Sequence, residues 1–298
     1  MMRWLRGMGW LLLWLWPTLD SADAATLLGL NHSTQLSELS GAERSLRDPT
    51  RLWAVNDSFG KAQLHALRED GEWLGAVTVN AAENHDWEDL AAFRENDKPY
   101  LLIADTGDNG GLRAALSLLV VVEPERADVR SVELAWRIDF RLPEGPRDVE
   151  AVAVDASEHC IYLIAKRHFP RVLYRLPLHP LDNGVVLLAE RVGSFDTLPA
   201  ASAKEIEQDP QYGRFRGDVT ALALDPAGHY ALVLSYRDAY FYPRSTGQSL
   251  LAALQNEATR LNLPPMPQAE ALALDPASGS VVVLSERLGA PIYRLRLP

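Results

Sequence analysis

The 298-residue sequence predicts an all-β fold, a β-propeller of five blades. Short runs rich in Val, Ile, Leu and Tyr, bounded by Gly, Pro, Asn and Asp, are typical of β-strands. A short phrase also recurs about every 50 to 70 residues, and such periods are typical of propellers. Its five copies are Glu38-Leu-Ser-Gly, Glu88-Asp-Leu-Ala, Glu150-Ala-Val-Ala, Thr220-Ala-Leu-Ala and Glu270-Ala-Leu-Ala.

Each copy begins an expected inner strand, and a second and a third strand follow it. The second strands cover residues 51–56, 100–105, 161–166, 230–236 and 281–286. Turns such as Asp225-Pro-Ala-Gly228 separate first from second strands, with Pro fixing φ and Gly taking the left-handed position. Each unit is therefore a small antiparallel sheet, the blade of a propeller.

The ends of the repeat region predict how the ring closes. Residues 26–31 form an apolar strand without a unit of its own, whereas the last unit ends after three strands. We expect residues 26–31 to supply the outer strand of the last blade. Six blades are the alternative, with a divergent blade in the longest spacing, but residues 197–216 there have a loop-like or helix-like pattern that favours an insertion. A helix over residues 245–258 is expected to cover the fourth blade.

Residues 1–24 have the pattern of a secretory signal peptide. Arg3 and Arg6 precede the apolar run of residues 10–16, and the small-x-small site Ala22-Asp23-Ala24 follows. We therefore expect an exported protein, periplasmic or extracellular, with one propeller domain over residues 26–298 and no membrane span once the signal is removed. A signal that is kept as an anchor is the alternative.

Charge and cysteine content narrow the classes of partner. The formal net charge is −11, which argues against nucleic acid and against an anionic membrane. Cys160 is the only cysteine, so no intramolecular disulfide can form, and its apolar strand-like context is that of a buried structural thiol. The expected partner is a small anionic molecule or a protein of the cell envelope, and the protein is expected to be a monomer.

Two acidic clusters are expected at one edge of a sheet, because adjacent ends of an antiparallel hairpin meet there. Residues 84–89 begin an inner strand, residues 105–110 follow the next strand, and residues 56–58 are the equivalent in the preceding unit. Clustered carboxylates repel one another unless a cation neutralises them, and oxygen ligands suit a hard cation such as Ca²⁺. The alternative is that these Asp and Asn residues only form turns. The predicted metal ligands are Glu38, Asn56, Asp86, Glu88 and Asp105.

A closed ring would also bring the repeated glutamates to a central channel. The predicted channel ring is Glu38, Glu88, Glu150 and Glu270. At the positions equivalent to Asn56 and Asp105, the third to fifth units carry cations that could bind an anionic ligand. The alternative is that these cations pair with neighbouring glutamates. The predicted ligand-binding residues are Lys166, Arg167, Arg237 and Arg287.

A catalytic role, if there is one, is predicted for His85, Asp86 and Glu88. His85 is the one histidine in an acidic cluster and could act as general base, although a turn or hydrogen-bonding role is the alternative. The sequence has no G-x-S-x-G elbow, no Walker A loop and no H-E-x-x-H motif.

The motifs resemble those of a family of secreted or lipid-anchored bacterial propeller proteins, largely uncharacterised. The matching segments are Trp53-Ala-Val-Asn-Asp-Ser58, Asn84 to Asp89, Asp105 to Asn109, Pro146-Arg-Asp-Val-Glu-Ala151 and Glu270-Ala-Leu-Ala273 with Ser285-Glu286. More distantly the chain is similar to propellers of the SdiA-regulated, gluconolactonase and esterase-like phytase types. That similarity implies a central channel, frequently a calcium ion and, in some members, hydrolysis of esters, lactones or phosphoesters. Thr220 departs from the glutamate pattern.

Two functions therefore remain open at this point. The first is an envelope propeller whose polar channel binds a divalent cation and a small anionic ligand. The alternative is a calcium-dependent hydrolase of an ester, lactone or phosphoester. A hydrolase rests on the distant relatives alone, so the sequence leaves open whether the protein is an enzyme.

Overall fold

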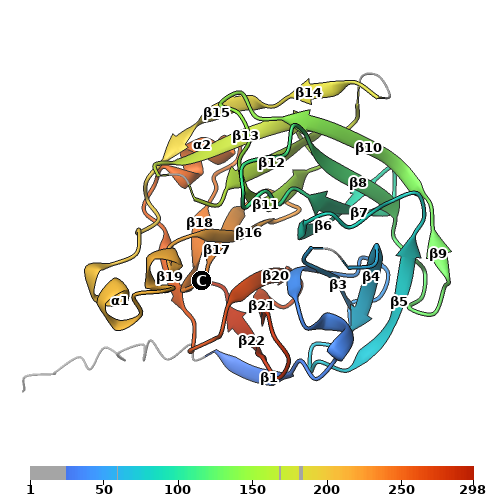
Figure 1. The fold of residues 1–298 in the computed structure, drawn as a ribbon, viewed down its shortest axis with the longest axis horizontal. Coiled ribbons are helices and arrows are strands. Elements are labelled where there is room, and N and C mark those ends of the chain that lie inside the picture. The colour runs from blue at the N-terminus through green and yellow to red at the C-terminus, as the bar shows by residue number, and fades with distance from the viewer. Residues whose placement is uncertain (1–24, 59, 168, 181–183) are drawn as a thin grey trace, which may run out of the picture.

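The computed structural model describes residues 25–58, 60–167, 169–180 and 184–298. Its strands form five separate sheets of four or five strands, arranged around a central axis as the blades of a propeller (Figure 1). The predicted all-β class and the count of five blades are confirmed. The predicted signal peptide, residues 1–24, lies outside the described residues.

In every blade the inner strand comes first, and the next three strands add outward by antiparallel pairing. Blade 1 consists of β2 (Leu39–Arg44), β3 (Leu52–Asn56), β4 (Gln63–Leu67), β5 (Trp73–Val79) and β9 (Ser131–Val132). Blade 2 consists of β6 (Trp87–Glu95), β7 (Lys98–Asp105), β8 (Leu116–Val122), β10 (Leu134–Arg141) and β14 (Val186–Leu188). Blade 3 consists of β11 (Val149–Asp155), β12 (Cys160–Ala165), β13 (Arg171–Pro177) and β15 (Glu190–Phe195).

The last two blades have four strands each. Blade 4 consists of β16 (Val219–Leu224), β17 (Tyr230–Ser235), β18 (Asp238–Pro243) and β19 (Thr259–Asn262). Blade 5 consists of β20 (Ala269–Asp275), β21 (Ser280–Ser285), β22 (Pro291–Arg296) and β1 (Thr26–Leu30). Because β1 pairs with β22 as the outermost strand of blade 5, the first described strand closes the ring, as predicted (Figure 1).

Two short strands cross between blades. The chain between β8 and β10 contributes β9, which runs parallel to β5 of blade 1. In the same way the chain between β13 and β15 contributes β14, which runs parallel to β10 of blade 2. Each of these strands pairs with the outer edge of the preceding blade, so that edge is not left open to another chain.

The core lies between the faces of adjacent blades. Apolar side chains that alternate along the strands form one buried cluster at each blade interface, including the clusters between blades 2 and 3 and between blades 3 and 4. The fully buried Trp53 and Trp87 lie in the cluster between blades 1 and 2. The Trp53 indole donates a hydrogen bond to Glu123 Oε1 at 3.0 Å, so this interface is also fixed by a buried polar contact.

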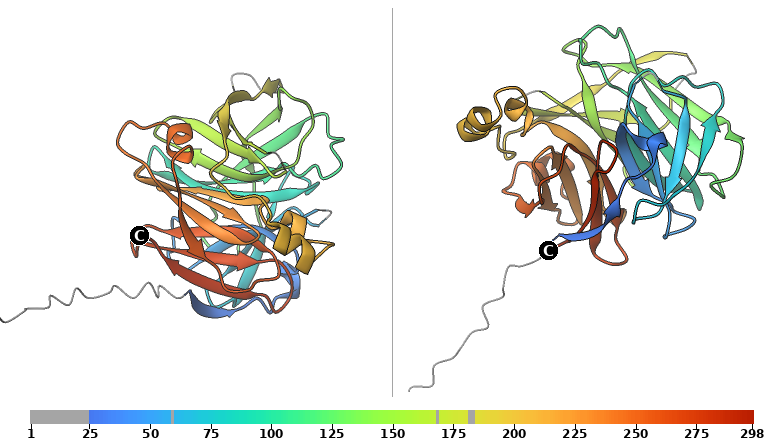
Figure 2. Two further views of the ribbon diagram at one scale, coloured as in Figure 1. Left: turned by 90° about the vertical axis from the view of Figure 1, so that its left-hand side faces the viewer. Right: turned by 60° about the horizontal axis from the view of Figure 1, so that its bottom comes forward.

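The helical segments are few and short. They are η1 (Thr34–Leu36), α1 (Ala203–Gln208), η2 (Gly213–Phe215) and α2 (Leu250–Leu254). α1 and η2 belong to the segment between β15 and β16, which projects from the ring (Figure 2) and confirms the predicted insertion. α2 is shorter than the helix predicted over residues 245–258, because Gly247 has φ 78° and Ser249 caps the first turn. Within the described residues, no helix is long and apolar enough to cross a membrane.

Candidate functional site

Every inner strand carries the same irregularity at its second residue. The pairing of each inner strand with its neighbour skips that residue, as in a β-bulge. The five skipped residues form the bulge ring: Ser40, Glu88, Glu150, Thr220 and Glu270. The predicted equivalence of Glu38 with the other glutamates is therefore wrong. Glu38 lies two residues earlier and is exposed, since the shared register follows the bulge and not the identity of the residue.

The two hydroxyl residues of the bulge ring connect neighbouring blades. Ser40 Oγ donates to the Trp87 carbonyl at 2.6 Å, and Thr220 Oγ1 donates to the Ala269 carbonyl at 2.8 Å. Trp87 and Ala269 are both the first residues of the next inner strand. Thr220 thus departs from glutamate at a position where the side chain joins two blades.

Equivalent backbone hydrogen bonds define two further sets of five residues, one residue of each set in every blade. In each blade, a backbone N–H at the end of the second strand donates to the carbonyl of the residue two before the bulge, at 2.8 to 3.3 Å. The donors are Asp57, Thr106, Lys166, Tyr236 and Glu286, and the acceptors are Glu38, Asp86, Asp148, Asp218 and Gln268. Lys166 is therefore equivalent to Asp57 and Thr106, and not to Asn56 and Asp105 as predicted. A shift of one residue along a strand moves the side chain to the opposite face.

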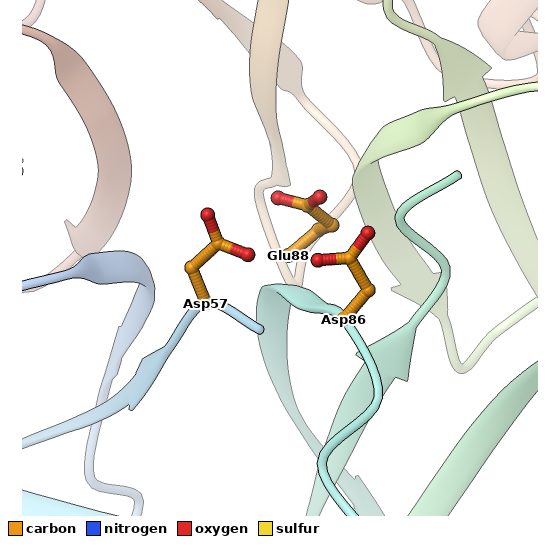
Figure 3. A group of neighbouring side chains, drawn as sticks. All are labelled: Asp57, Asp86 and Glu88. Carbon is orange, nitrogen blue, oxygen red and sulfur yellow. The ribbon is translucent and has the colours of Figure 1, made fainter. Parts of the chain in front are cut away.

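Carboxylates of blades 1 to 3 converge where these strand ends meet. Ligand atoms of Asp57, Asp86 and Glu88 lie within 4.8 Å of one another, and the three side chains point toward one another (Figure 3). Ligand atoms of Glu88 also lie within 4.8 Å of those of Asp148 and Glu150. We call these five residues the carboxylate cluster.

Burial makes this cluster costly to ionise. Burial, then a hydrogen bond with Asp57 and the negative charges of Asp57 and Asp148, raise the pKa of Asp86 to about 7. Burial is also the main cause that holds the pKa of Glu88 well above its usual range. A bound cation would offset the repulsion that these groups share.

The cluster also contains oxygens without a partner. Asp148 and Glu150 are 7% and 2% exposed, yet Asp148 Oδ2 and Glu150 Oε2 accept no hydrogen bond from the described residues. Buried polar atoms are normally hydrogen-bonded, so such atoms in a functional cluster point to an absent ligand. The donor set, oxygen only, fits a hard divalent cation.

Lys166 is a buried cation beside the carboxylate cluster. It is buried, forms an ion pair with Glu150, and its Nζ lies 5.3 Å from the ring centroid of Tyr236. The same charge acts on Glu270, but burial outweighs it and raises the pKa of Glu270 to about 8. Lys166 is thus already paired with a carboxylate, which is the alternative that the sequence left open for the cations.

The two overlapping carboxylate groups differ in their counter-charges. In the group of Glu88, Asp148 and Glu150, the Lys166 ammonium already pairs with Glu150. In the other group, neither Asp57, Asp86 nor Glu88 forms an ion pair with any Lys or Arg of the described chain. The group of Asp57, Asp86 and Glu88 is therefore the better candidate for a metal centre.

The other predicted metal ligands do not join the cluster. Asp105 accepts a hydrogen bond from the Asp86 backbone N–H at 3.2 Å and forms an ion pair with Arg113 at 3.0 Å. His85, the predicted general base, is exposed and lies 3.2 Å from both Asp105 and Glu83. Asn56 donates to the Gln35 carbonyl at 2.7 Å. These contacts support the loops around the cluster.

Asp57 is the member of the carboxylate cluster that sequence reasoning missed. The Asn84 amide donates to the backbone carbonyls of Asn56 and Asp57 at 3.0 and 2.9 Å, which fixes the end of β3 beside the start of β6. Aligning Asp57, and not Asn56, with Lys166 would have found it, because both are the first residues after their strands.

A pocket of about 400 Å³ lies beside the equivalent strand ends of blades 3 to 5. Arg167 of blade 3 and Arg287 of blade 5 line it. Tyr236 and Gln268, a donor and an acceptor of the equivalent backbone hydrogen bonds, also line it. The remaining lining residues are Asp209, Tyr212, Phe215, Arg216 and Pro267. We call this the arginine pocket.

The predicted ligand-binding cations thus have three different surroundings. Arg167 and Arg287 line the arginine pocket, whereas Lys166 is paired within the channel. Arg237 is not among the lining residues, because its guanidinium pairs with Glu205 at 2.8 Å and Asp238 at 3.4 Å. Arg216 takes its place, and no motif marked it, since it lies in the insertion.

Comparisons with known proteins add little to this geometry. No protein-family model matches the chain, and no curated protein matches it. A solved structure of a luciferin-regenerating enzyme aligns with 91% of this chain and 95% of its own, at 9% sequence identity and a TM-score of 0.47. The assignment as a propeller rests on the strand pairing described above.

Proposed function

We propose that this is an exported propeller protein of the cell envelope whose channel mouth binds a divalent cation, Ca²⁺, and a small anionic ligand beside it. The observation that carries the proposal is the convergence of the half-buried Asp57 and Asp86 with the buried Glu88, none of them ion-paired with a Lys or Arg of the described chain. Three oxygen donors of this kind suit Ca²⁺ better than the softer transition metals.

The residues have separate roles in this proposal. Asp57, Asp86 and Glu88 would hold the cation, and Asp148 would add negative charge beside Glu88. Asn84 positions Asp57 through the backbone of β3. Arg167 and Arg287 would attract the anionic ligand to the same mouth.

Calcium binding is tested by calorimetric titration of the chelator-treated protein with Ca²⁺, Mg²⁺ and Zn²⁺. We expect one Ca²⁺ per chain, weaker binding of Mg²⁺, and a higher melting temperature when Ca²⁺ is present, because a ligand that binds only the folded state stabilises it. A protein that binds none of these ions would end the proposal. N-terminal sequencing of the protein from a periplasmic fraction tests the export and the cleavage.

A hydrolase is the second candidate, and one observation favours it. Asp86 is a half-buried acid whose pKa is raised to about 7, so near neutral pH it can hold or release a proton at the mouth. A bound cation would supply the polarisation of an ester, lactone or phosphoester oxygen. His85 lies outside the cluster, so Asp86 and Glu88 are the catalytic candidates that remain from the sequence prediction.

The two candidates are separated by turnover. We would assay aryl esters, lactones and aryl phosphates with Ca²⁺ and after chelation. Hydrolysis that requires Ca²⁺ and is lost in Glu88→Gln supports the hydrolase. Calcium binding without turnover of any of these substrates leaves the binding protein and rejects the hydrolase.

A further inference from the structure

The insertion between blades 3 and 4 builds a wall for the arginine pocket. Of the lining residues, Asp209, Tyr212, Phe215 and Arg216 come from this single segment. The rest come from blades 3, 4 and 5. The repeat by itself provides no such wall, because the other connections between blades lack a helical insertion of this kind in the described chain.

Several contacts fix the insertion on the propeller. Ser202 and Glu205 form a capping box at the start of α1, and the Glu205 carboxylate accepts two hydrogen bonds from Arg237 at 2.8 and 2.9 Å. A Cβ atom on Gly213 would lie 2.1 Å from the Glu205 carbonyl oxygen, so the turn into η2 packs directly on α1. The pocket wall is therefore held in place before a ligand arrives, which lowers the entropy cost of binding.

The pocket carries an excess of positive charge. Three arginines and one aspartate line it, which leaves a net charge of +2. Arg287 donates to Gln268 at 2.9 Å, and Arg167 donates to Asn109 at 2.6 Å and forms an ion pair with Asp218 at 3.7 Å. Arg216 is half-buried and forms no ion pair or side-chain hydrogen bond with the described residues. Guanidinium groups with free donors suit the oxygens of a carboxylate or phosphate.

The remaining walls are flat and apolar. Arg167 lies 5.4 Å from the ring centroid of Phe215, an arrangement that orients its guanidinium. Tyr212 is 56% exposed and lines the same pocket together with Pro267 and Tyr236. An aromatic side chain that is left open in a small-molecule pocket is a surface for a flat apolar body.

We propose that the arginine pocket binds a small organic oxyanion with an aromatic body, the oxyanion held by Arg216, Arg167 and Arg287 and the body packed on Tyr212. This deepens the proposed function, on which it rests, by naming the class of the anionic ligand. The volume of about 400 Å³ lies within the range of small-molecule sites. Tyr236 joins the pocket to the channel, since it lines the pocket and contacts Lys166.

The test measures binding of phenyl phosphate, benzoate and inorganic phosphate by calorimetry, with Ca²⁺ present. We expect phenyl phosphate or benzoate to bind at least about tenfold more tightly than inorganic phosphate, because only they carry the aromatic body. The tighter of the two identifies the oxyanion. Equal binding of all three, or binding of none, overturns the proposal.

Matched variants locate the site. Arg216→Gln is expected to weaken the aromatic anion about tenfold. Arg214→Gln removes the same charge two residues away, where Arg214 contacts Phe215 from outside the pocket lining, and is expected to change affinity less than about twofold. Tyr212→Ala should weaken phenyl phosphate and not inorganic phosphate. Equal losses in Arg214→Gln and Arg216→Gln would show a general charge effect and overturn the site.

Calcium titration of the same variants separates this inference from the proposed function. Arg216→Gln should bind Ca²⁺ as the unchanged protein does, since Arg216 touches no member of the carboxylate cluster. Calcium binding with no anion binding rejects only the pocket. Arg216-dependent anion binding with no calcium binding rejects only the metal site.

Discussion

The carboxylate cluster and the arginine pocket occupy the same mouth and are built on equivalent strand ends, yet they have opposite charge. Asp57 and Lys166 make the same backbone hydrogen bond in their respective blades, and so does Tyr236. The Asp57 side chain belongs to the carboxylate cluster, and the Lys166 ammonium neutralises part of that cluster. The Tyr236 side chain lines the arginine pocket. The difference teaches that the propeller fixes where side chains converge, while the residue at each equivalent position decides the chemistry.

The two regions also differ in how their charges are balanced. Within the described chain, the cluster has one ion-paired ammonium, Lys166, for five buried or half-buried carboxylates. The pocket lining has three guanidinium groups and one carboxylate, and Arg216 forms no ion pair with the described residues. The carboxylate cluster therefore has an excess of negative charge and the arginine pocket an excess of positive charge. A cation would stabilise the first region, and an anion would stabilise the second.

Removing the internal cation should give the largest effect. Without Ca²⁺, Lys166→Met is expected to lower the free energy of unfolding by about 3–5 kcal/mol, because Glu150 loses its buried partner. Added Ca²⁺ should recover part of this loss, since the cluster then attracts the cation more strongly. Urea unfolding with and without Ca²⁺ measures both, with the exposed Lys61→Met as control. Equal stability of Lys166→Met and the unchanged protein would contradict the role of Lys166.

Glu88 is common to both carboxylate groups, so its loss should affect metal binding most. Glu88→Gln is expected to weaken Ca²⁺ binding by about 100-fold, equivalent to about 2.7 kcal/mol. The fold should persist, because a neutral amide is easier to bury than a carboxylate. Calorimetry measures the affinity, and the exposed Glu83→Gln is the control. Calcium binding that survives in Glu88→Gln would place the metal elsewhere.

Arg237 should act on the arginine pocket through the insertion alone. Arg237→Gln removes the contact to Glu205 and is expected to weaken the aromatic anion about tenfold while protease cleavage within residues 197–217 becomes faster. Arg260→Gln is the matched control, because Arg260 also pairs with Asp238 but not with the insertion. Calcium affinity should stay constant in both variants. An unchanged cleavage rate in Arg237→Gln would mean that other contacts hold the insertion.

A pH-dependent effect is expected from Glu43, an acid on the inner strand of blade 1. Glu43 accepts from the Leu274 backbone N–H at 3.2 Å, and burial raises its pKa to about 8 from 4.5. Between pH 4.5 and about 8 the folded state therefore holds a proton that the unfolded chain has released, so stability falls as pH rises through this window. Glu43→Gln, which keeps the acceptor oxygen, should therefore make the decline in stability from pH 5 to pH 8 smaller.

Urea unfolding at pH 5 and pH 8 measures this decline. The exposed Glu72→Gln serves as control and should leave the decline unchanged. A decline of the same size in Glu43→Gln would assign the pH dependence to other buried acids. Asp89 is one of these, since burial holds its pKa well above the usual range.

The sequence by itself determined the class and closure of the fold. Strand-like runs, a repeat of about 50 to 70 residues and an unpartnered apolar strand at residues 26–31 were enough to predict five blades and the role of β1. These features can be read from neighbouring residues or from a regular spacing along the chain. The alternation of side chains between two faces identifies a strand without knowledge of its partners. Two members of the carboxylate cluster, Asp86 and Glu88, could also be named, because they flank the first residue of one inner strand.

Only the tertiary structure decided the register and the partners. The bulge at the second residue of each inner strand aligns Ser40 with Glu88, and the following strand end presents Asp57 where the sequence suggested Asn56. A shift of one or two residues leaves the sequence pattern almost unchanged but turns a side chain toward or away from the channel. The tertiary structure also decided that Arg216, and not the predicted Arg237, lines the arginine pocket. Which arginine is paired depends on where a distant insertion packs, and the spacing of residues along the chain does not specify that contact.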